Sequence, residues 1–243
     1  MDPETRIFME EGLAKSFRIV AGLPMYNEEE TIGTVVTKTL DFVDSVICVD
    51  DGSSDSGARI AESCGAKVHR HRVNRGYGGA LKSLFKIAKE MDADALVILD
   101  SDGQHEPEDI PKLLEPILSE EADFVIGSRF VDGGGSENMP AYRRLGIKVI
   151  TATSNLSSNL NIQDTQSGFR AFSKLAIEKL RFDSEGMELS LEMLEDAHEK
   201  KLKIQEVPTI IRYDVPKGSN FTAISHGFTV LAWAMLSLSQ KKP

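Results

Sequence analysis

Two aspartates, Asp100 and Asp102, stand one residue apart directly after the apolar run Ala95–Leu99. A continuously apolar run is typical of a strand that is buried on both faces of a sheet. Carboxylates at the carboxyl end of such a strand lie where open α/β sheets bind ligands. Two carboxylates aimed at one point repel each other unless a cation lies between them, and oxygen ligands without thiolates suit Mg²⁺ or Mn²⁺. A polar strand end that caps the next helix is the alternative.

Acidic residues also follow the first two predicted strands. Tyr26, Asn27 and Glu28 come after the first strand, and Asp50 and Asp51 come after the second. Because parallel strands end at the same edge of a sheet, we expect these clusters to lie close to the Asp100–Asp102 pair. Each cluster also has a local explanation, since acidic residues favour helix N-termini and Asp and Ser cap helices.

The elements that must position these residues alternate along the chain. The expected strands are Arg18–Leu23, Ser45–Val49, Lys67–His71, Ala95–Leu99, Asp123–Gly127, Lys203–Val207 and Thr209–Tyr213. The expected helices are Glu28–Leu40, Ser56–Ser63, Gly79–Met91, Pro107–Leu118, Ala141–Asn159, Glu188–Ala197 and Phe221–Leu238. This alternation predicts an α/β fold with a mostly parallel, Rossmann-like sheet and helices on both faces. Three successive glycines make Val131–Asn138 the clearest flexible loop.

A glycine-rich turn, Asn74–Ala80, precedes one of these helices. Glycines at a strand-to-helix turn let backbone N–H groups approach phosphate oxygens, although a tight turn alone explains them equally well. The dinucleotide-binding fingerprint fails, because Leu81 stands where its third glycine belongs. The chain also lacks the lysine-containing phosphate loop of many nucleotidases.

The histidines give weaker signals. His69 and His71 alternate with arginines on a predicted strand, which is compatible with a solvated or a phosphate-facing side. His105 follows Gln104 and is expected in an exposed loop, although it could contact phosphates at a metal site.

The composition is that of an ordinary globular protein, with 41% hydrophobic and 27% charged residues among 243. A net charge of −10 argues against a nucleic-acid partner. The two cysteines have no metal or redox spacing, and the N-terminus has no basic and apolar leader, so a cytoplasmic location is expected. Residues Phe221–Leu238 form an amphipathic pattern without charged residues, which predicts a helix that packs on its own domain, on a partner helix or on a membrane surface.

The order of the motifs resembles that of family 2 glycosyltransferases with the GT-A fold. The residues that carry the resemblance are Pro24-x-Tyr26-Asn27-Glu28, Val49-Asp50-Asp51-Gly52-Ser53, Asn74-x-Gly76, Asp100-Ser101-Asp102-Gly103-Gln104, Gly127-Ser128-Arg129, Asp164–Arg170 and Glu206-Val207-Pro208. The chain is most similar to the dolichyl-phosphate sugar synthase branch. The resemblance implies a catalytic domain over residues 1–219, with residues 1–16 as an extension, and a C-terminal helix and tail over residues 220–243 on the acceptor side.

The resemblance also implies roles for individual residues. The metal that bridges the donor diphosphate would be bound by Asp100, Asp102 and Gln104. The nucleotide-sugar would be bound by Pro24, Tyr26, Asn27, Glu28, Asp50, Asp51, Asn74, Gly76, Ser101, Arg212 and Lys217. Arg129 and Arg170 would hold phosphate, because a guanidinium group binds two phosphate oxygens at once. Tyr77 departs from the lysine that relatives often carry in this motif.

The implied activity is a metal-dependent, inverting transfer of a sugar from a UDP- or GDP-sugar to a polyprenyl or dolichyl phosphate. Such an enzyme would work peripherally at the cytoplasmic face of a membrane. A phosphate monoester has its second pKa near ~6 and needs no strong general base. One alternative is transfer to a carbohydrate hydroxyl, for which Asp164 and Glu188 are the candidate bases. Another is a non-catalytic module that binds a nucleotide-sugar.

Overall fold

The structure is a computed structural model that describes residues 17–158, 161–186 and 188–213. The expected N-terminal extension, Lys217 and the expected helix Phe221–Leu238 lie outside the described residues, so these predictions stay untested. No described helix is long and apolar enough to cross a membrane.

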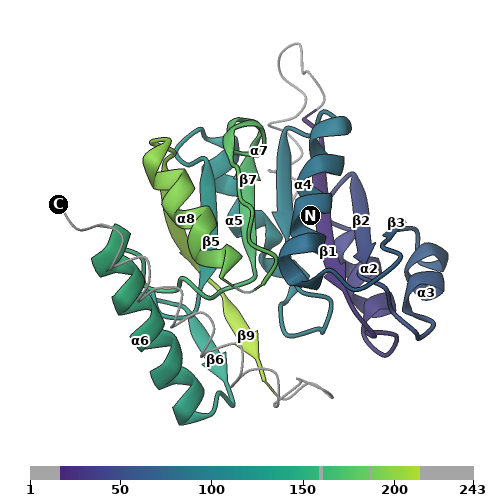
Figure 1. The fold of residues 1–243 in the computed structure, drawn as a ribbon, viewed down its shortest axis with the longest axis horizontal. Coiled ribbons are helices and arrows are strands. Elements are labelled where there is room, and N and C mark those ends of the chain that lie inside the picture. The colour runs from purple at the N-terminus through teal and green to yellow at the C-terminus, as the bar shows by residue number, and fades with distance from the viewer. Residues whose placement is uncertain (1–16, 159–160, 187, 214–243) are drawn as a thin grey trace.

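A seven-stranded sheet forms the centre of the fold, in the order β3-β2-β1-β4-β7-β5-β8 (Figure 1). The strands are β1 (Ile19–Met25), β2 (Ser45–Asp50), β3 (Lys67–Arg70), β4 (Ala95–Ile98), β5 (Phe124–Ser128), β7 (Arg170–Ser173) and β8 (Ile204–Pro208). All pairs are parallel except those of β7, which runs antiparallel between β4 and β5. The predicted mostly parallel α/β sheet is therefore confirmed.

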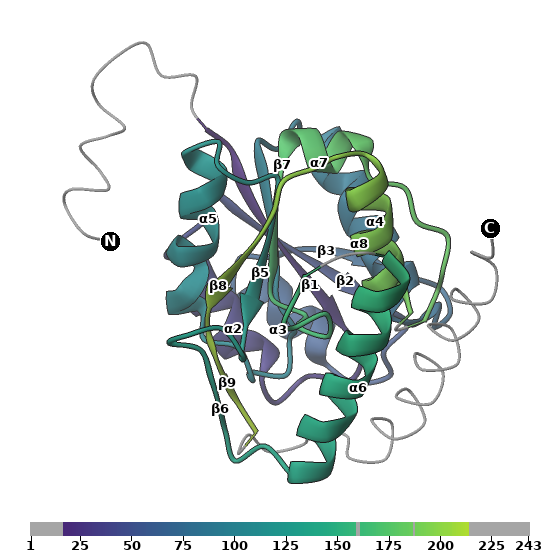
Figure 2. The same ribbon diagram turned by 90° about the vertical axis from the view of Figure 1, so that its left-hand side faces the viewer.

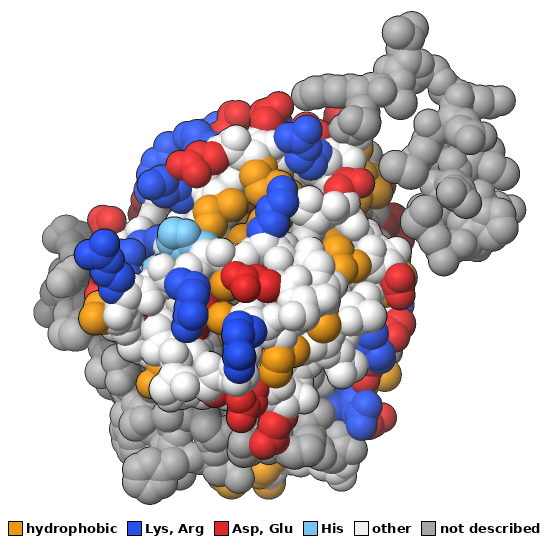
Figure 3. Space-filling model, turned by 90° about the vertical axis from the view of Figure 1, so that its right-hand side faces the viewer, with side chains coloured by type: hydrophobic (Ala, Val, Ile, Leu, Met, Phe, Trp, Pro, Cys, Tyr) orange, Lys and Arg blue, Asp and Glu red, His pale blue; other side chains and the backbone are white. Residues whose placement is uncertain are grey.

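Helices cover both faces of this sheet, as the side view in Figure 2 shows. One apolar core lies beneath α4 (Gly76–Glu90), α7 (Lys174–Lys179) and α8 (Leu189–Glu199). The other lies beneath α2 (Ile32–Thr39), α3 (Gly57–Ser63) and α5 (Ile110–Leu118), which the short 3-10 turn η1 (Pro107–Asp109) precedes. The sheet is thus buried on both faces, which explains its continuously apolar strands. Figure 3 views the side on which β3 forms one edge of the sheet.

A small second layer extends past the carboxyl edge of the sheet. Strands β6 (Gly135–Glu137) and β9 (Ile210–Arg212) pair in parallel, and helix α6 (Ala141–Ser158) follows β6 (Figure 1). The expectation that Val131–Asn138 is a flexible loop is therefore wrong in part, because β6 lies inside it. The pairing partner of β6 comes from a distant part of the chain, and local sequence cannot indicate it.

Two helix boundaries and two further elements differ from the sequence-based expectations. Helix α2 begins at Ile32 rather than Glu28, because Thr31 donates its hydroxyl hydrogen to the Ser101 carbonyl and the chain before it forms a turn. Helix α4 begins at Gly76 rather than Gly79. Strand β7 and helix α7 were not expected at all. With only four residues, β7 is too short to produce a clear apolar pattern.

The glycines at the start of α4 allow a close contact between backbones. The Gly78 N–H donates to the Glu185 carbonyl at 2.8 Å. A Cβ atom on Gly78 would lie only 2.5 Å from the Ser184 carbonyl oxygen. Gly76 has φ +77°, a left-handed conformation that favours glycine. The chain segment around Ser184 and Glu185 thus occupies the place where the sequence suggested phosphate.

We predict that Gly78→Ala lowers the free energy of unfolding by about 1–3 kcal/mol, because the added methyl group has no room. Gly146→Ala is the matched control, since nothing lies within 4 Å of a Cβ atom at this position of α6. Alanine at an open helical site should stabilise slightly. Urea denaturation measures both values. A Gly78→Ala protein as stable as the control would contradict the close contact.

Candidate active site

Three neighbouring strands, β1, β2 and β4, end at the candidate site. Hydrogen bonds tie their ends together: the Ser101 hydroxyl donates to the Pro24 carbonyl at 2.7 Å, and the Asp51 N–H donates to the Met25 carbonyl at 2.9 Å. These bonds place the acidic residues after β2 and β4 on either side of β1. The sequence analysis expects the acidic residues at the strand ends to lie at one edge of the sheet. The order of β2, β1 and β4 in the sheet agrees with this expectation.

Three carboxylates at this edge repel one another. Burial raises the pKa of Glu28 to about 7, and the negative charge of Asp102 adds to this effect. Burial and the charge of Asp100 also raise the pKa of Asp102. Burial opposes the ionisation of Asp100 as well, but a hydrogen bond from His105 and the charges of His105 and Arg170 lower its pKa overall. The edge therefore carries negative charge that no described cation contacts directly, apart from the His105 imidazole when it is protonated.

This donor set fits a divalent cation that also binds a phosphorylated ligand. The Asp100 side chain is 35% exposed, so it is open to a ligand. The described residues contain no group of three or more His, Cys, Asp or Glu side chains able to hold a metal alone. Mg²⁺ is commonly held by one or two carboxylates together with substrate phosphates, and Mn²⁺ prefers similar oxygen ligands. Gln104 is buried beside this pair, and its backbone N–H donates to Asp102 Oδ1 at 2.9 Å.

His105 differs from its expectation as an exposed loop residue. The side chain is buried, its Nε2 lies 3.2 Å from Asp100 Oδ2, and its ring packs on Phe169. A β-bridge between His105 and Ile211 brings β9 over this loop. Burial of His105 thus depends on a contact between distant parts of the chain, which the local sequence does not indicate.

The residues expected to bind the nucleotide mostly shape the loops at this edge. Asn27 has φ 57°, and its side-chain oxygen accepts the Ser54 N–H at 2.9 Å. Asn74 accepts the Gly76 N–H at 3.0 Å, while Pro24 is buried at the end of β1. Tyr26 presents an aromatic side chain at the surface, and the residue is 50% exposed. An exposed aromatic ring of this kind can stack on a nucleobase.

The two adjacent aspartates at the end of β2 have different partners. Asp50 accepts the Ser53 N–H at 2.9 Å and an Arg70 N–H at 2.8 Å, and it is fully buried. Asp51 accepts the Arg75 backbone N–H on both oxygens and lies 2.6 Å from His71 Nδ1. His71 is buried, which excludes the solvated side considered for it.

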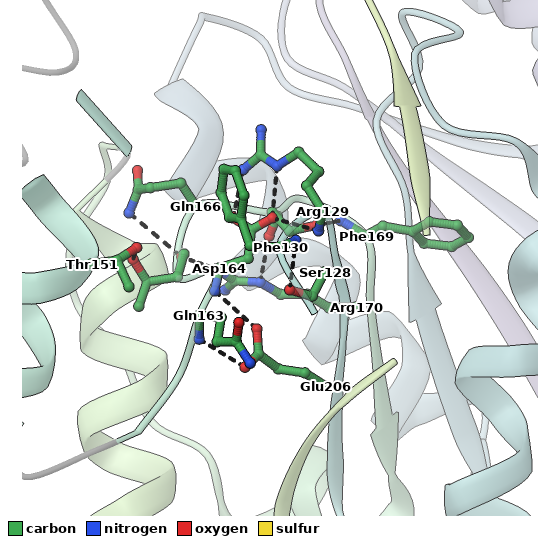
Figure 4. A network of polar contacts seen from close by, with 12 residues as sticks. Ser128, Arg129, Phe130, Thr151, Gln163, Asp164, Gln166, Phe169, Arg170 and Glu206 are labelled. Atoms are coloured by element: carbon green, nitrogen blue, oxygen red, sulfur yellow. Dashed lines mark hydrogen bonds and ion pairs between the residues drawn. The ribbon is translucent and has the colours of Figure 1, made fainter. Parts of the chain in front are cut away.

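Arg129 belongs to a buried network that Figure 4 displays. Its guanidinium group donates to both Asp164 oxygens at 2.6 Å and to the Tyr213 hydroxyl at 2.6 Å. Glu206 accepts the Asp164 N–H at 2.9 Å, so the network also includes β8. Asp164 is fully buried and ion-paired with Arg129, an arrangement that does not favour it as a general base.

Arg170 is also bound within the protein rather than open to a ligand. It donates to the Ser167 carbonyl at 2.8 Å and to the Thr165 carbonyl at 2.9 Å, and only 2% of its surface is exposed. The expectation that Arg129 and Arg170 bind phosphate directly is therefore not supported by their contacts. Both act on the site through their charge, which lowers the pKa of Asp100.

Arg212 and Arg143 are two further basic residues, and they have different partners. Arg212 donates to Glu106 at 3.1 Å, so its charge has a protein partner. Arg143, which the sequence analysis did not select, stacks on the Tyr213 ring at 4.8 Å and lowers the pKa of Asp102 through its charge. The Arg143–Arg144 pair at the start of the predicted helix was the one available signal.

Glu188 keeps one uncommitted oxygen. Its Oε1 accepts the Gly186 N–H at 3.2 Å, whereas Oε2 is buried and has no hydrogen-bond partner among the described residues. An unpartnered carboxylate oxygen is available to accept a proton or a hydroxyl hydrogen. Glu188 therefore remains a candidate for a general base, in contrast to Asp164.

Comparisons with known proteins agree with this geometry. The sequence profile of glycosyl transferase family 2 matches residues 21–181. The chain is 34% identical to a UDP-N-acetylglucosamine–dolichyl-phosphate N-acetylglucosaminyltransferase from Methanococcus voltae, over 82% of this chain and 88% of the relative. It is 32% identical to an undecaprenyl-phosphate mannosyltransferase from Micrococcus luteus, over 79% of this chain and 82% of the relative.

Among solved structures, the fold is similar to that of glucosyl-3-phosphoglycerate synthase from Mycobacterium tuberculosis in complex with Mn²⁺ and UDP-glucose. The TM-score is 0.74 at 22% identity, and the match covers 92% of this chain and 80% of the other. This likeness concerns the fold alone. The chain is thus a glycosyltransferase with the GT-A fold, and it belongs to glycosyl transferase family 2.

Proposed function

We propose that the chain transfers a sugar from a UDP- or GDP-sugar to a polyprenyl phosphate, with inversion at the sugar and with a divalent metal. The observation that carries the proposal is the crowding of Glu28, Asp100 and Asp102 at the carboxyl edge of the sheet. Relatives named for dolichyl-phosphate and undecaprenyl-phosphate acceptors support the acceptor class. A neighbour bound to Mn²⁺ and UDP-glucose supports the donor and the metal.

Asp100 and Asp102 would hold Mg²⁺ or Mn²⁺, with Gln104 beside them. The ion would stabilise the negative charge that develops on the departing nucleoside diphosphate. His105 orients Asp100 through its hydrogen bond, and the buried charges of Arg129 and Arg170 keep Asp100 ionised. The nucleoside would be bound by Tyr26, by Asp50 or Asp51, and by the loops after β1 and β2. The shape of these loops would depend on Pro24, Asn27, Asn74, Gly76 and Ser101.

The acceptor phosphate would attack the anomeric carbon from the side opposite the diphosphate, so one carbon–oxygen bond forms as the other breaks. A phosphate monoester is largely ionised near neutral pH and needs no base. Burial of Asp164 in an ion pair with Arg129 is compatible with such an acceptor. Arg143, half-buried and close enough to act on Asp102, would hold the acceptor phosphate. Arg212 and Lys217 would complete the basic side.

The location follows from the acceptor. A polyprenyl phosphate is held in a membrane by its chain, so the enzyme would work peripherally at the cytoplasmic face, where nucleotide-sugars are available. We assign the catalytic domain to residues 1–219, and residues 220–243 would contribute an amphipathic helix on the acceptor side.

A carbohydrate hydroxyl is the second candidate acceptor. The unpartnered Glu188 Oε2 favours it, because a hydroxyl nucleophile needs a base. A non-catalytic module that binds a nucleotide-sugar is a third possibility, and loss of turnover in metal-site variants would distinguish it.

We predict that the purified protein, Mn²⁺ and a labelled UDP- or GDP-sugar will transfer label to dolichyl phosphate, and that the product will partition into butanol. Chelation with EDTA should abolish transfer, and added Mn²⁺ or Mg²⁺ should restore it. Transfer only to water-soluble glycans would favour the second candidate, and transfer that persists in EDTA would contradict the metal.

Asp102→Asn is expected to lower turnover by about 100-fold or more, because the site loses one negative charge and an amide oxygen is a weaker metal ligand than a carboxylate. Glu115→Gln, an exposed acid on α5, is the control and should retain normal rates. Full activity in Asp102→Asn would favour the non-catalytic module or another metal site.

Asp164→Asn should lower the free energy of unfolding by about 3–5 kcal/mol, because the buried Arg129 loses its counter-charge. Glu121→Gln, which changes an exposed acid, should have no such effect. Chemical denaturation measures the loss. A variant with normal stability and no turnover would instead restore Asp164 as a catalytic base.

A further inference from the structure

His71 lies between two polar side chains at the donor side of the sheet edge. Its Nδ1 is 2.6 Å from Asp51 Oδ1, and its Nε2 is 2.8 Å from Ser83 Oγ. Asp51 follows β2, His71 follows β3, and Ser83 belongs to α4. His71 and Asp51 are both buried, whereas Ser83 is half-buried, so the contact between His71 and Asp51 is the one that is shielded from solvent.

Asp51, His71 and Ser83 contact one another in the same order as the Asp-His-Ser triad of hydrolases. The position of Ser83 nevertheless excludes nucleophilic catalysis by its hydroxyl group. Ser83 lies inside α4, and its hydroxyl also lies 3.2 Å from the Gly79 carbonyl of the preceding turn. Backbone N–H groups in a helix interior are bonded within the helix and cannot stabilise an oxyanion. The geometry therefore requires a different use for the imidazole.

The hydrogen-bond partners of the His71 ring determine which of its nitrogens donates and which accepts. An ionised carboxylate only accepts hydrogen bonds, so the Nδ1–H of His71 must donate to Asp51. At Nε2, the Ser83 hydroxyl donates to a neutral imidazole, or it accepts from a protonated one and turns its own hydrogen to the Gly79 carbonyl. The neighbouring charges are Asp50, Arg70 and the ring of His69, which packs edge-on at 5.5 Å. In either state, Asp51 Oδ1 stays fixed.

Asp51, rather than Asp50, has a carboxylate able to serve a ligand. Asp50 is fully buried, and its charge is paired with the Arg70 guanidinium group, while its other oxygen accepts the Ser53 N–H. Asp51 Oδ1 accepts from His71 and from the Arg75 backbone, whereas Oδ2 shares only the Arg75 N–H at 3.0 Å. Oδ2 thus retains capacity to accept another hydrogen bond.

We propose that His71 is a positioning residue for the donor nucleotide. It fixes Asp51 so that Oδ2 accepts the ring N–H of the nucleobase, which is N3–H in uracil and N1–H in guanine. The inference rests on the proposed function, because it concerns recognition of the donor. It assigns His71 and Ser83 to donor affinity, not to the chemical step near Asp100.

Two isosteric variants test this role, because the amide nitrogen of Asn matches Nδ1 and that of Gln matches Nε2. His71→Asn keeps a donor toward Asp51, and His71→Gln keeps only the contact with Ser83. His71→Gln should weaken UDP or GDP binding in the presence of Mn²⁺ by about tenfold, and His71→Asn by much less. In transfer assays, His71→Gln should raise the donor KM and leave kcat nearly unchanged.

A modified ligand identifies the bond. If UDP is the nucleotide bound, 3-methyl-UDP should bind wild type about tenfold more weakly than UDP, and this difference should shrink in His71→Gln. If GDP binds instead, 1-methyl-GDP replaces it. His69→Gln is the matched control, because His69 belongs to β3, two positions before His71, and is exposed. It should bind as wild type.

The outcomes are separable. Binding of neither UDP nor GDP to wild type would overturn both this inference and the proposed function. Normal UDP or GDP affinity in a folded His71→Gln, or an equal loss in His69→Gln, would overturn the inference alone. If His71→Gln does not fold, Ser83→Ala keeps the imidazole and removes its outer support. Ser83→Ala should then weaken binding by about threefold, and unchanged binding would contradict the proposal.

Discussion

Repulsion among carboxylates at one edge of the sheet is the constraint on which the rest of the structure depends. Glu28, Asp100 and Asp102 come from the ends of β1 and β4, and burial together with their mutual charges raises the pKa values of Glu28 and Asp102. Folding must bring these groups together, because parallel neighbouring strands end at the same place. The fold thus builds a site that favours a cation before any ligand arrives.

Two buried arginines offset part of this negative charge, although their guanidinium groups do not contact the three carboxylates. Arg129 and Arg170 are buried behind it, each bound to protein oxygens, and their charge reaches Asp100 from a distance. Burying an arginine is costly unless it is paired, and Asp164 supplies the counter-charge for Arg129. Because Tyr213 and Glu206 join the same network, the layer of β6, β9 and α6 is fastened to the main sheet.

Much of this arrangement is predictable from the sequence, because it depends on patterns within short stretches of the chain. Continuously apolar runs such as Ala95–Leu99 indicate buried strands, and the rule that parallel strands share an edge then brings Asp51 and Asp100 to the same side. The metal-binding candidates therefore needed only short-range patterns. The resemblance to family motifs added the expectation of a nucleotide-sugar donor and of a class of acceptor.

What could not be predicted depends on contacts between distant residues. His105 is buried because β9 bridges to it, and Asp164 is held in an ion pair because Arg129 lies opposite it. The glycines in the first turn of α4 face the backbone of Ser184 and Glu185, over a hundred positions further along the chain. In each case the residue type was correctly singled out, but its partner, and hence its role, comes from tertiary packing.

The account's central claim is that the acidic edge and a nucleoside diphosphate bind one divalent ion together. Titration of Mn²⁺ followed by electron paramagnetic resonance, with and without UDP or GDP, tests this most directly. Linkage requires that each ligand strengthen the binding of the other by the same factor. The account predicts that Mn²⁺ binds more tightly with the nucleotide and that Asp100→Asn removes the gain. Equal Mn²⁺ affinity with and without nucleotide would contradict it.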